Sequence, residues 1–282
     1  RCIRKFLYGK VIIALHITLN MKRSLLKYFN ILLFLWGSFL LSQNHSLSFD
    51  GAGSYVELAP SSSLAASNNE LTVESWIKVS SSNNNAHSSI FGARLGYGYV
   101  LYAGSNDIDV PGAANFVIFT SDDSWNELQG NTDLRDDQWH HVTATYDGTV
   151  AKLYIDGELD NEIYFNSDYL STLDGGNYST NIGTANHASE YFNGIIDDLA
   201  IWNRALTEQQ IQAQMNAPLL GNELGLAAYW NFNEGQGNFL TDLSGNGNDG
   251  AINGATWNDD VPTEPVYGAI FVPGDFSLIQ EA

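Results

Sequence analysis

Short apolar runs separated by turn-forming residues constrain this chain more than any other feature of its sequence. From Ser46 to Trp257, segments rich in Val, Ile, Thr and aromatic residues alternate with clusters of Gly, Asn, Asp and Ser. The runs predict strands over 71–79, 89–95, 99–103, 115–120, 139–146 and 150–155. Because regularly spaced short strands must bury one face against another sheet, this middle part is predicted to form an antiparallel β-sandwich.

One helix interrupts the strand pattern. Thr207 and Gln210 have the spacing of a capping box, and Ile211 and Met215 form an apolar i, i+4 stripe just after it. These signals predict a single short helix over Glu208–Met215.

The first 42 residues differ in composition from the rest of the chain. Seven of the twelve basic residues lie in the first 27 positions, and no acidic residue occurs before Asp50. Met21 begins a basic stretch that leads into the apolar run 31–41, which is shorter than the roughly 20 residues that a membrane span needs. We therefore expect a secretory signal peptide over 21–42, preceded by an upstream translated segment over 1–20. The predicted location is secreted, extracellular or at the cell surface.

Removal of the predicted leader leaves a strongly acidic protein. Five basic residues then face all 32 acidic ones, a formal charge of −27. Such a surface repels nucleic acid and anionic membranes, so we expect no nucleic-acid partner and no membrane insertion after signal cleavage. The only cysteine, Cys2, lies in the leader, which removes disulfides from the predicted mature protein.

Four sequence blocks together resemble a known family. They are F-D-G-A-G-S-Y-V-E-L (49–58), L-T-V-E-S-W-I (71–77), D-Q-W-H-H-V-T-A-T-Y-D-G (137–148) and the block 191–206. They resemble the laminin-G-like, pentraxin-like jelly roll of the concanavalin A-like lectin/glucanase superfamily. The resemblance implies an all-β fold, an antiparallel two-sheet jelly-roll sandwich with one short helix, over residues 43–258.

A fifth block of the same family stands in an unusual place. The sequence G-L-A-A-Y-W-N-F-N-E-G at 225–235 and the Asn- and Gly-rich stretch up to Trp257 normally precede the F-D-G turn. Here they follow the other blocks. Two arrangements remain open from sequence: this block closes the same sandwich, or it begins a second copy.

Two adjacent acids lie inside an apolar strand of the 191–206 block. A buried carboxylate must be paired, hydrogen-bonded or bound to metal, because its desolvation costs several kcal/mol. The resemblance implies a calcium ion, Ca2+, held by the carboxylate of Asp50, the carbonyl of Gly53, and Asp197 or Asp198. Strand alternation predicts that the last two side chains point to opposite faces, so that one of them ligates. The alternative is a hydrogen-bonded Asp197 and a solvated Asp198.

A tryptophan in a polar loop suggests a ligand surface. Trp125 lies in S-D-D-S-W-N-E, where a large apolar ring is unexpected. We expect either stacking on a sugar ring or packing of the ring back onto the sandwich edge. The predicted binding surface comprises Tyr97, Asp122, Asp123, Trp125, Asn186 and His187, and its predicted partner is a polysaccharide or glycoconjugate, with a cell-surface protein as the alternative.

An enzymatic alternative comes from Glu158, Asp160 and Glu162. Their E-x-D-x-E spacing predicts three carboxylates on one strand face and resembles family 16 glycoside hydrolases of the same superfamily. Asn161 departs from that motif, and the stretch directly follows a turn. An exposed charged strand is the favoured interpretation, and we expect no catalytic residue in this domain.

The C-terminal end predicts a linker and a second domain. The stretch D-D-V-P-T-E-P and the residue after it (259–266) are typical of a stiff polar linker. Residues 267–282 resemble the start of a parallel β-helix of the pectin methylesterase kind. The favoured function is therefore a secreted, calcium-binding carbohydrate-binding module that directs an attached polysaccharide-active domain to its substrate. An adhesion module without a sugar site and a glycoside hydrolase are the alternatives.

Overall fold

The structure, a computed structural model, describes residues 44–66, 69–92, 98–119, 125–165, 180–185 and 190–262 of the 282-residue chain. The predicted segments 1–20, 21–42 and 267–282 lie outside these residues. In chain order the elements are β1 (Ser46–Asp50), β2 (Tyr55–Leu58), the 3-10 helix η1 (Ser62–Leu64), β3 (Leu71–Val79), β4 (Ser89–Gly92), β5 (Tyr99–Ala103), β6 (Ala114–Phe119), β7 (Trp125–Gln129), β8 (Trp139–Tyr146), β9 (Val150–Ile155), β10 (Glu158–Tyr164), β11 (Thr180–Ile182), β12 (Asn193–Trp202), α2 (Glu208–Met215), β13 (Leu226–Trp230), β14 (Phe239–Leu240), β15 (Gly250–Asn253) and β16 (Thr256–Asn258).

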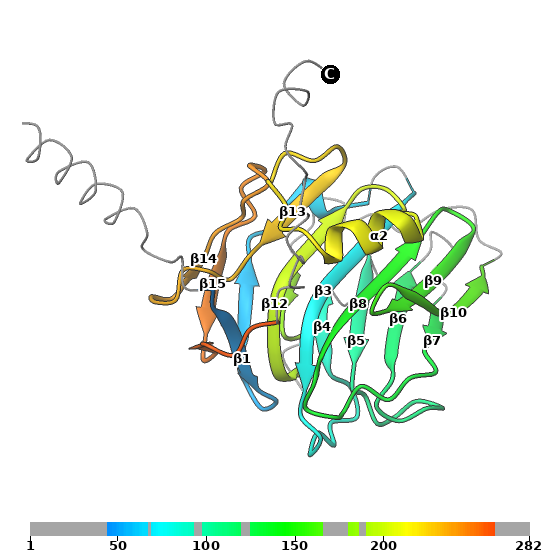
Figure 1. Cartoon of the computed structure of the whole chain (residues 1–282), viewed down its shortest axis with the longest axis horizontal. Coiled ribbons are helices and arrows are strands. Elements are labelled where there is room, and N and C mark those ends of the chain that lie inside the picture. The colour runs from blue at the N-terminus through cyan, green and yellow to red at the C-terminus, as the bar shows by residue number, and fades with distance from the viewer. Residues whose placement is uncertain are drawn as a thin grey trace, which may run out of the picture. The chain divides into compact units, whose positions relative to one another are not determined.

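The strands form two antiparallel sheets (Figure 1). Sheet A has the order β10-β9-β8-β3-β12-β1-β16, with β13 also paired to β12. Sheet B has the order β14-β15-β2-β11-β4-β5-β6-β7. The predicted all-β jelly-roll sandwich is confirmed.

Alternation on β3 shows how each sheet divides its side chains. Leu71, Val73 and Ile77 belong to the large core cluster between the sheets. Glu74 and Trp76 point to the other side, because successive residues of a strand face opposite ways. Sheet A therefore has an inner face in the core and an outer face with its own polar and aromatic residues.

The C-terminal block closes the same sandwich. β13 pairs with β12 in sheet A, and β16 pairs with β1 through the register Ser46↔Asn258. In sheet B, β15 pairs with β2, from Gly250↔Leu58 to Asn253↔Tyr55. Of the two arrangements left open by the sequence, the structure has closure.

Helix α2 has the predicted boundaries and the predicted capping box, in which the Thr207 side chain accepts a hydrogen bond from the Gln210 backbone. Its Ile211 is fully buried and packs with Trp202 and Tyr229 in a second apolar cluster, on the outer face of sheet A. Figure 1 shows the helix lying across this sheet. In the described part of the chain, no helix is long and apolar enough to span a membrane.

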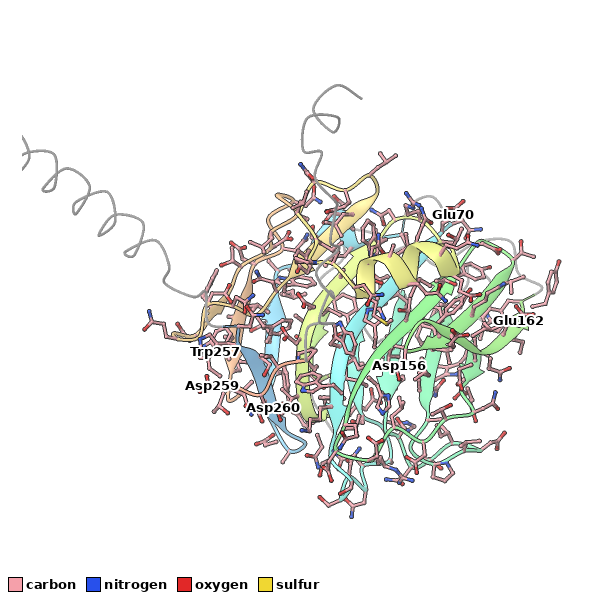
Figure 2. The ribbon with its side chains drawn as sticks, viewed as in Figure 1. Glu70, Asp156, Glu162, Trp257, Asp259 and Asp260 are labelled. Carbon is pink, nitrogen blue, oxygen red and sulfur yellow. The ribbon has the colours of Figure 1, made fainter. Side chains whose placement is uncertain are left out.

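The folded domain continues past the predicted end at residue 258. The Asp260 carboxylate accepts hydrogen bonds from Lys78 Nζ and Trp139 Nε1, both at 2.9 Å. Asp259 Oδ1 lies 3.0 Å from His45 Nδ1. Figure 2 shows Asp259 and Asp260 beside Trp257, next to β1. The first residues of the predicted linker therefore bond to side chains of sheet A and of the segment before β1.

Candidate functional site

Asp50 closes a tight turn at the end of β1. Its Oδ1 accepts hydrogen bonds from the backbone N–H groups of Ala52, Gly53 and Ser54 at 2.9, 3.0 and 3.1 Å, and from the Ser54 hydroxyl at 2.7 Å. These bonds, led by the one from Ala52 and followed by the Ser54 hydroxyl, lower the pKa of Asp50 to about 2. The sequence F-D-G-A-G-S thus builds a hydrogen-bonded turn around one carboxylate oxygen.

Asp197 and Asp198 lie at a β-bulge in β12. Along the β3–β12 ladder Asp197 pairs with Trp76 and Ala200 with Glu74, so β12 has one residue more than β3 in this interval. Asp198 takes the extra position with a positive φ of 47°. Both acids consequently line one cavity on the outer face of sheet A. The prediction that alternation sends them to opposite faces is wrong, because the bulge breaks the alternation.

Both aspartate side chains accept hydrogen bonds from neighbouring groups. Asp197 is 4% exposed, and its Oδ1 accepts the backbone N–H of Asp198 at 2.9 Å. Asp198 Oδ1 accepts the Tyr229 hydroxyl at 2.6 Å. The alternative interpretation expected a hydrogen-bonded Asp197 and a solvated Asp198. The structure agrees with it for Asp197, whereas Asp198 is half-buried and hydrogen-bonded.

The four predicted calcium ligands do not meet at one point. Asp50 pairs with Asn193, four residues before Asp197 on the same strand, which is roughly 13 Å along a ladder. Gly53 stays with Asp50 in the turn and donates its N–H to it. Within the described ranges, no group of three or more His, Cys, Asp and Glu side chains could hold one metal ion. Calcium binding stays a prediction, but these residues do not fit a single site.

A second bulge changes the E-x-D-x-E motif on β10. Leu159 pairs with Tyr154 and Asn161 with Leu153, so Asp160 is the extra residue. Glu158 then lies on the same side of the sheet as its partner Ile155, and Glu162 lies on the opposite side with its partner Lys152. Lys152 Nζ is 3.1 Å from Glu162 Oε2. The prediction of three carboxylates on one face is wrong because of this bulge. Glycoside hydrolysis needs two carboxyls that flank one sugar, and the bulge turns Glu158 and Glu162 to opposite sides of the strand.

Trp125 begins β7, the outermost strand of sheet B, and it is 44% exposed. Its ring contacts Phe119 edge to face, with centroids 5.0 Å apart and an interplanar angle of 84°. The expected packing onto the sandwich edge is therefore confirmed for one side of the ring, much of the ring remains accessible, and stacking on a sugar stays a prediction.

A shallow groove of about 270 Å³ lies between β7 and β10, the edge strands of sheets B and A. Its walls are mostly polar, and they comprise Asp109, Glu127, Leu128, Gln129, Asn161, Glu162 and Ile163. Asn161 Nδ2 donates to the Gln129 carbonyl at 2.8 Å and joins the two strands. Figure 2 shows Glu162 on β10, on the side of the molecule opposite Trp257.

A carboxylate on β7 connects the groove to Trp125. Glu127 Oε1 accepts hydrogen bonds from Asn115 Nδ2 at 2.6 Å and from Gln129 Nε2 at 3.1 Å. Its Oε2 lies 3.4 Å from Trp125 Nε1. Neighbouring side chains thus hold Glu127 in place beside the exposed ring. Sequence reasoning missed Glu127, although a period-2 pattern after Trp125 would have placed it on the same face of β7.

The other predicted surface residues, namely Tyr97, Asp122, Asp123, Asn186 and His187, lie outside the described residues. The strand ends beside two of these loops lie together, because Phe119 N donates to the Gly98 carbonyl at 2.9 Å. Ala185, just before the third loop, belongs to one buried apolar cluster with Phe119, and just after this loop the Glu190 carbonyl accepts the N–H of Ser89 at 3.2 Å.

Comparison with known proteins decides the family. The family model Laminin_G_3, described as the concanavalin A-like lectin/glucanases superfamily, matches residues 50–212. The chain belongs to this superfamily. Among curated proteins, no sequence matches this laminin-G-like chain.

Solved structures share the laminin-G-like fold at low identity. A candidate carbohydrate-binding protein from Bacteroides ovatus is similar with a TM-score of 0.62 and 20% identity, over 79% of this chain and 62% of its own. A heptameric SAP-like pentraxin from Limulus polyphemus is similar with a TM-score of 0.48 and 17% identity, over 77% of this chain and 95% of its own. The chain thus spans 62% of the length of the Bacteroides ovatus protein. The likeness to the Bacteroides ovatus protein shows the fold.

Proposed function

We propose that this laminin-G-like domain is a non-catalytic carbohydrate-binding module and that Trp125 with the β7–β10 groove is its binding site. The observation that carries the proposal is an exposed tryptophan ring fixed beside an open polar groove. Membership in a superfamily of lectins and glucanases supports this choice, as does the Bacteroides ovatus neighbour, described as a candidate carbohydrate-binding protein.

The chemistry of the groove suits a sugar chain. One face of a sugar ring is lined with C–H groups and can stack on an aromatic ring, while its hydroxyls donate to and accept from planar polar groups. Trp125 offers the ring, and Glu127, Gln129 and Asn161 offer carboxylate and amide groups. An open groove also admits an extended polymer, which an enclosed pocket does not.

We also propose secretion, targeting of an attached domain and calcium binding, each on separate grounds. Secretion rests on the signal-like composition of residues 21–42. Targeting of an attached polysaccharide-active domain rests on the resemblance of 267–282 to a β-helix start. Calcium binding rests on the family resemblance and on the large negative charge, without an assigned set of ligands.

Affinity electrophoresis tests the carbohydrate proposal. The chain is run through native gels cast with neutral or acidic polysaccharides, with calcium and then with chelator. Retardation by one polymer is expected, and Trp125→Ala should abolish it while the chain stays folded, with only the small fall in melting temperature that loss of the Phe119 contact causes. Phe239→Ala is the matched control, because Phe239 is an aromatic residue 53% exposed on β14, at the opposite edge of the same sheet.

Two results would contradict the proposal. Retardation that persists in Trp125→Ala and disappears in Phe239→Ala would move the site to the other edge of sheet B. A folded chain that no polysaccharide retards would favour a protein-binding adhesion module instead.

A further inference from the structure

A second cavity lies on the outer face of sheet A, apart from the β7–β10 groove. It has a volume of about 190 Å³. Its floor comes from four neighbouring strands, with His141 on β8, Glu74 and Trp76 on β3, Asp197 and Asp198 on β12, and Tyr229 on β13. Its other walls come from the end of α2, the segment 217–219 that follows, and residues near both ends of the domain. An apolar cavity of about 150 Å³ holds benzene, so this one has room for a six-membered ring.

Two buried oxygen atoms in this cavity lack hydrogen-bond donors. Glu74 is 3% exposed, and its Oε1 accepts the Trp202 indole N–H at 2.8 Å. Among the described residues its Oε2 has no hydrogen-bond partner, and it lies 3.8 Å from His141 Nε2, too far for a hydrogen bond. Gln214 Oε1 on α2, which also lines the cavity, is likewise buried and without a partner within the described part of the chain. A buried acceptor without a hydrogen bond destabilises the site, so a ligand that donates to both oxygen atoms removes that cost when it binds.

The charge of the cavity has the same sign throughout. Three carboxylates line it, those of Glu74, Asp197 and Asp198, and no Lys or Arg is among the lining residues. The Tyr229 hydroxyl is already committed as a donor to Asp198. A cavity with acceptors, negative charge and no cation of its own favours a ligand that brings positive charge and N–H donors.

We propose that this cavity binds a small organic molecule that carries a protonated primary amine, with its ammonium group donating to Glu74 Oε2 and Gln214 Oε1 and the two aspartates adding negative charge to the cavity wall. The ammonium group supplies three donors, and the indole of Trp76 and the phenol ring of Tyr229 supply aromatic surface for the cation and the carbon body. A metal ion is the poorer occupant, because the acidic side chains of the described chain form no metal-holding group. The proposal stands independently of carbohydrate binding at Trp125.

Isothermal titration calorimetry of the full chain tests it with three probes of the same ring size. Cyclohexylammonium provides charge and N–H donors, cyclohexanol lacks the charge, and N,N,N-trimethylcyclohexylammonium keeps the charge without donors. The titrations are done at about pH 8, above the pKa of about 7 to which burial raises Glu74. Cyclohexylammonium is expected to bind, and each of the other two should bind about tenfold more weakly, since each loses one charge-assisted contribution.

Variants separate the assigned atoms from the rest of the acidic surface. Glu74→Gln and Gln214→Leu should each weaken cyclohexylammonium binding about tenfold, which corresponds to roughly 1.4 kcal/mol. Gln214 is only partly buried, near the end of α2, so its variant keeps the fold even if Glu74→Gln lowers stability. Glu57→Gln, an exposed acid on β2 of sheet B that lines neither cavity, is the matched control and should leave binding unchanged. Equal affinity for cyclohexanol or the trimethyl probe, unchanged binding in both variants, or no binding at all would overturn the proposal.

Discussion

Glu74 and His141 lie diagonally across β3 and β8, with Oε2 of the glutamate 3.8 Å from Nε2 of the histidine. Burial raises the pKa of Glu74 to about 7, and the Trp202 hydrogen bond only partly offsets this. Burial also lowers the pKa of His141 to about 4. Between about pH 4.5 and 6.5 the folded pair therefore holds one proton, on Glu74. The unfolded pair also holds one proton in this range, on His141, while its glutamate is charged.

This equality predicts how stability depends on pH. Between the unfolded pKa values of 4.5 for Glu74 and 6.5 for His141, folding neither takes up nor releases a proton at the pair, so the pair adds no slope to the free energy of unfolding. In Glu74→Gln, His141 is the only titrating member of the pair, and its folded pKa is below its unfolded pKa. The free energy of unfolding should therefore fall by about 3 kcal/mol as the pH drops from 6.5 towards 4.

His141→Asn should give the opposite slope. Glu74 alone has a raised folded pKa, so its contribution is complete below pH 4.5 and is lost as the pH rises to about 7, again by about 3 kcal/mol. Urea unfolding of both variants and the native chain across this range measures the differences. Variant curves that run parallel to the native curve would contradict the assignment.

Asp50→Ala tests whether the F-D-G turn depends on calcium. The change removes an acceptor shared by three backbone N–H groups and the Ser54 hydroxyl, at an exposed site. We expect a loss of about 1–2 kcal/mol, equal in calcium and in chelator. Asp50→Asn keeps an acceptor oxygen and should lose less. A fall in melting temperature confined to calcium-containing buffer would make Asp50 a calcium ligand.

Asp242 organises the Asn- and Gly-rich turn before β15. It is 7% exposed, and it accepts the backbone N–H groups of Tyr229, Ser244 and Asn248 at 3.1, 2.9 and 2.9 Å. Asp242→Ala leaves these donors buried and unpaired, so thermal or urea unfolding should show a loss of about 2–4 kcal/mol. Asp259→Ala is the control, because that side chain is 93% exposed and its ion pair with His45 contributes little. Equal effects of the two changes would argue against this role.

Thr207→Ala tests the cap of α2, the helix that covers the outer face of sheet A. The change removes the side-chain half of the capping box with Gln210 and should cost about 1 kcal/mol. Thr207→Ser retains the hydroxyl and should stay within a few tenths of the native value. Urea unfolding of the two variants side by side measures the difference, and a cost equal in both would assign it to the lost methyl group.

Local sequence signals predicted the regular elements well. The strand over 71–79 and the helix over 208–215 have the predicted limits, because apolar alternation and the Thr207 cap act within a few residues. The two bulges, at Asp160 and Asp198, were not predictable in this way. A bulge depends on the pairing register with the neighbouring strand, so its position cannot be predicted from the sequence of one strand.

The outer cavity was beyond sequence reasoning for a related reason. Trp76 lies inside a strand block, where a core position is expected, yet it faces the cavity. Glu74 shows no sign of burial in its own sequence context. Helix α2 and the chain up to Pro262 bury these residues, and contacts between segments so far apart do not follow from local pattern.

The closure of the sandwich by β15 and β16 decides when this domain can fold. Ser46 on β1 bonds to Asn258, 212 residues later, so the first strand lacks one of its neighbours until nearly the whole domain has been made. At about 5–20 residues per second, ribosomal synthesis of that interval takes roughly 10–40 s. During this time β1 and β2 present unsatisfied strand edges, which expose the nascent chain to pairing with other chains and to aggregation.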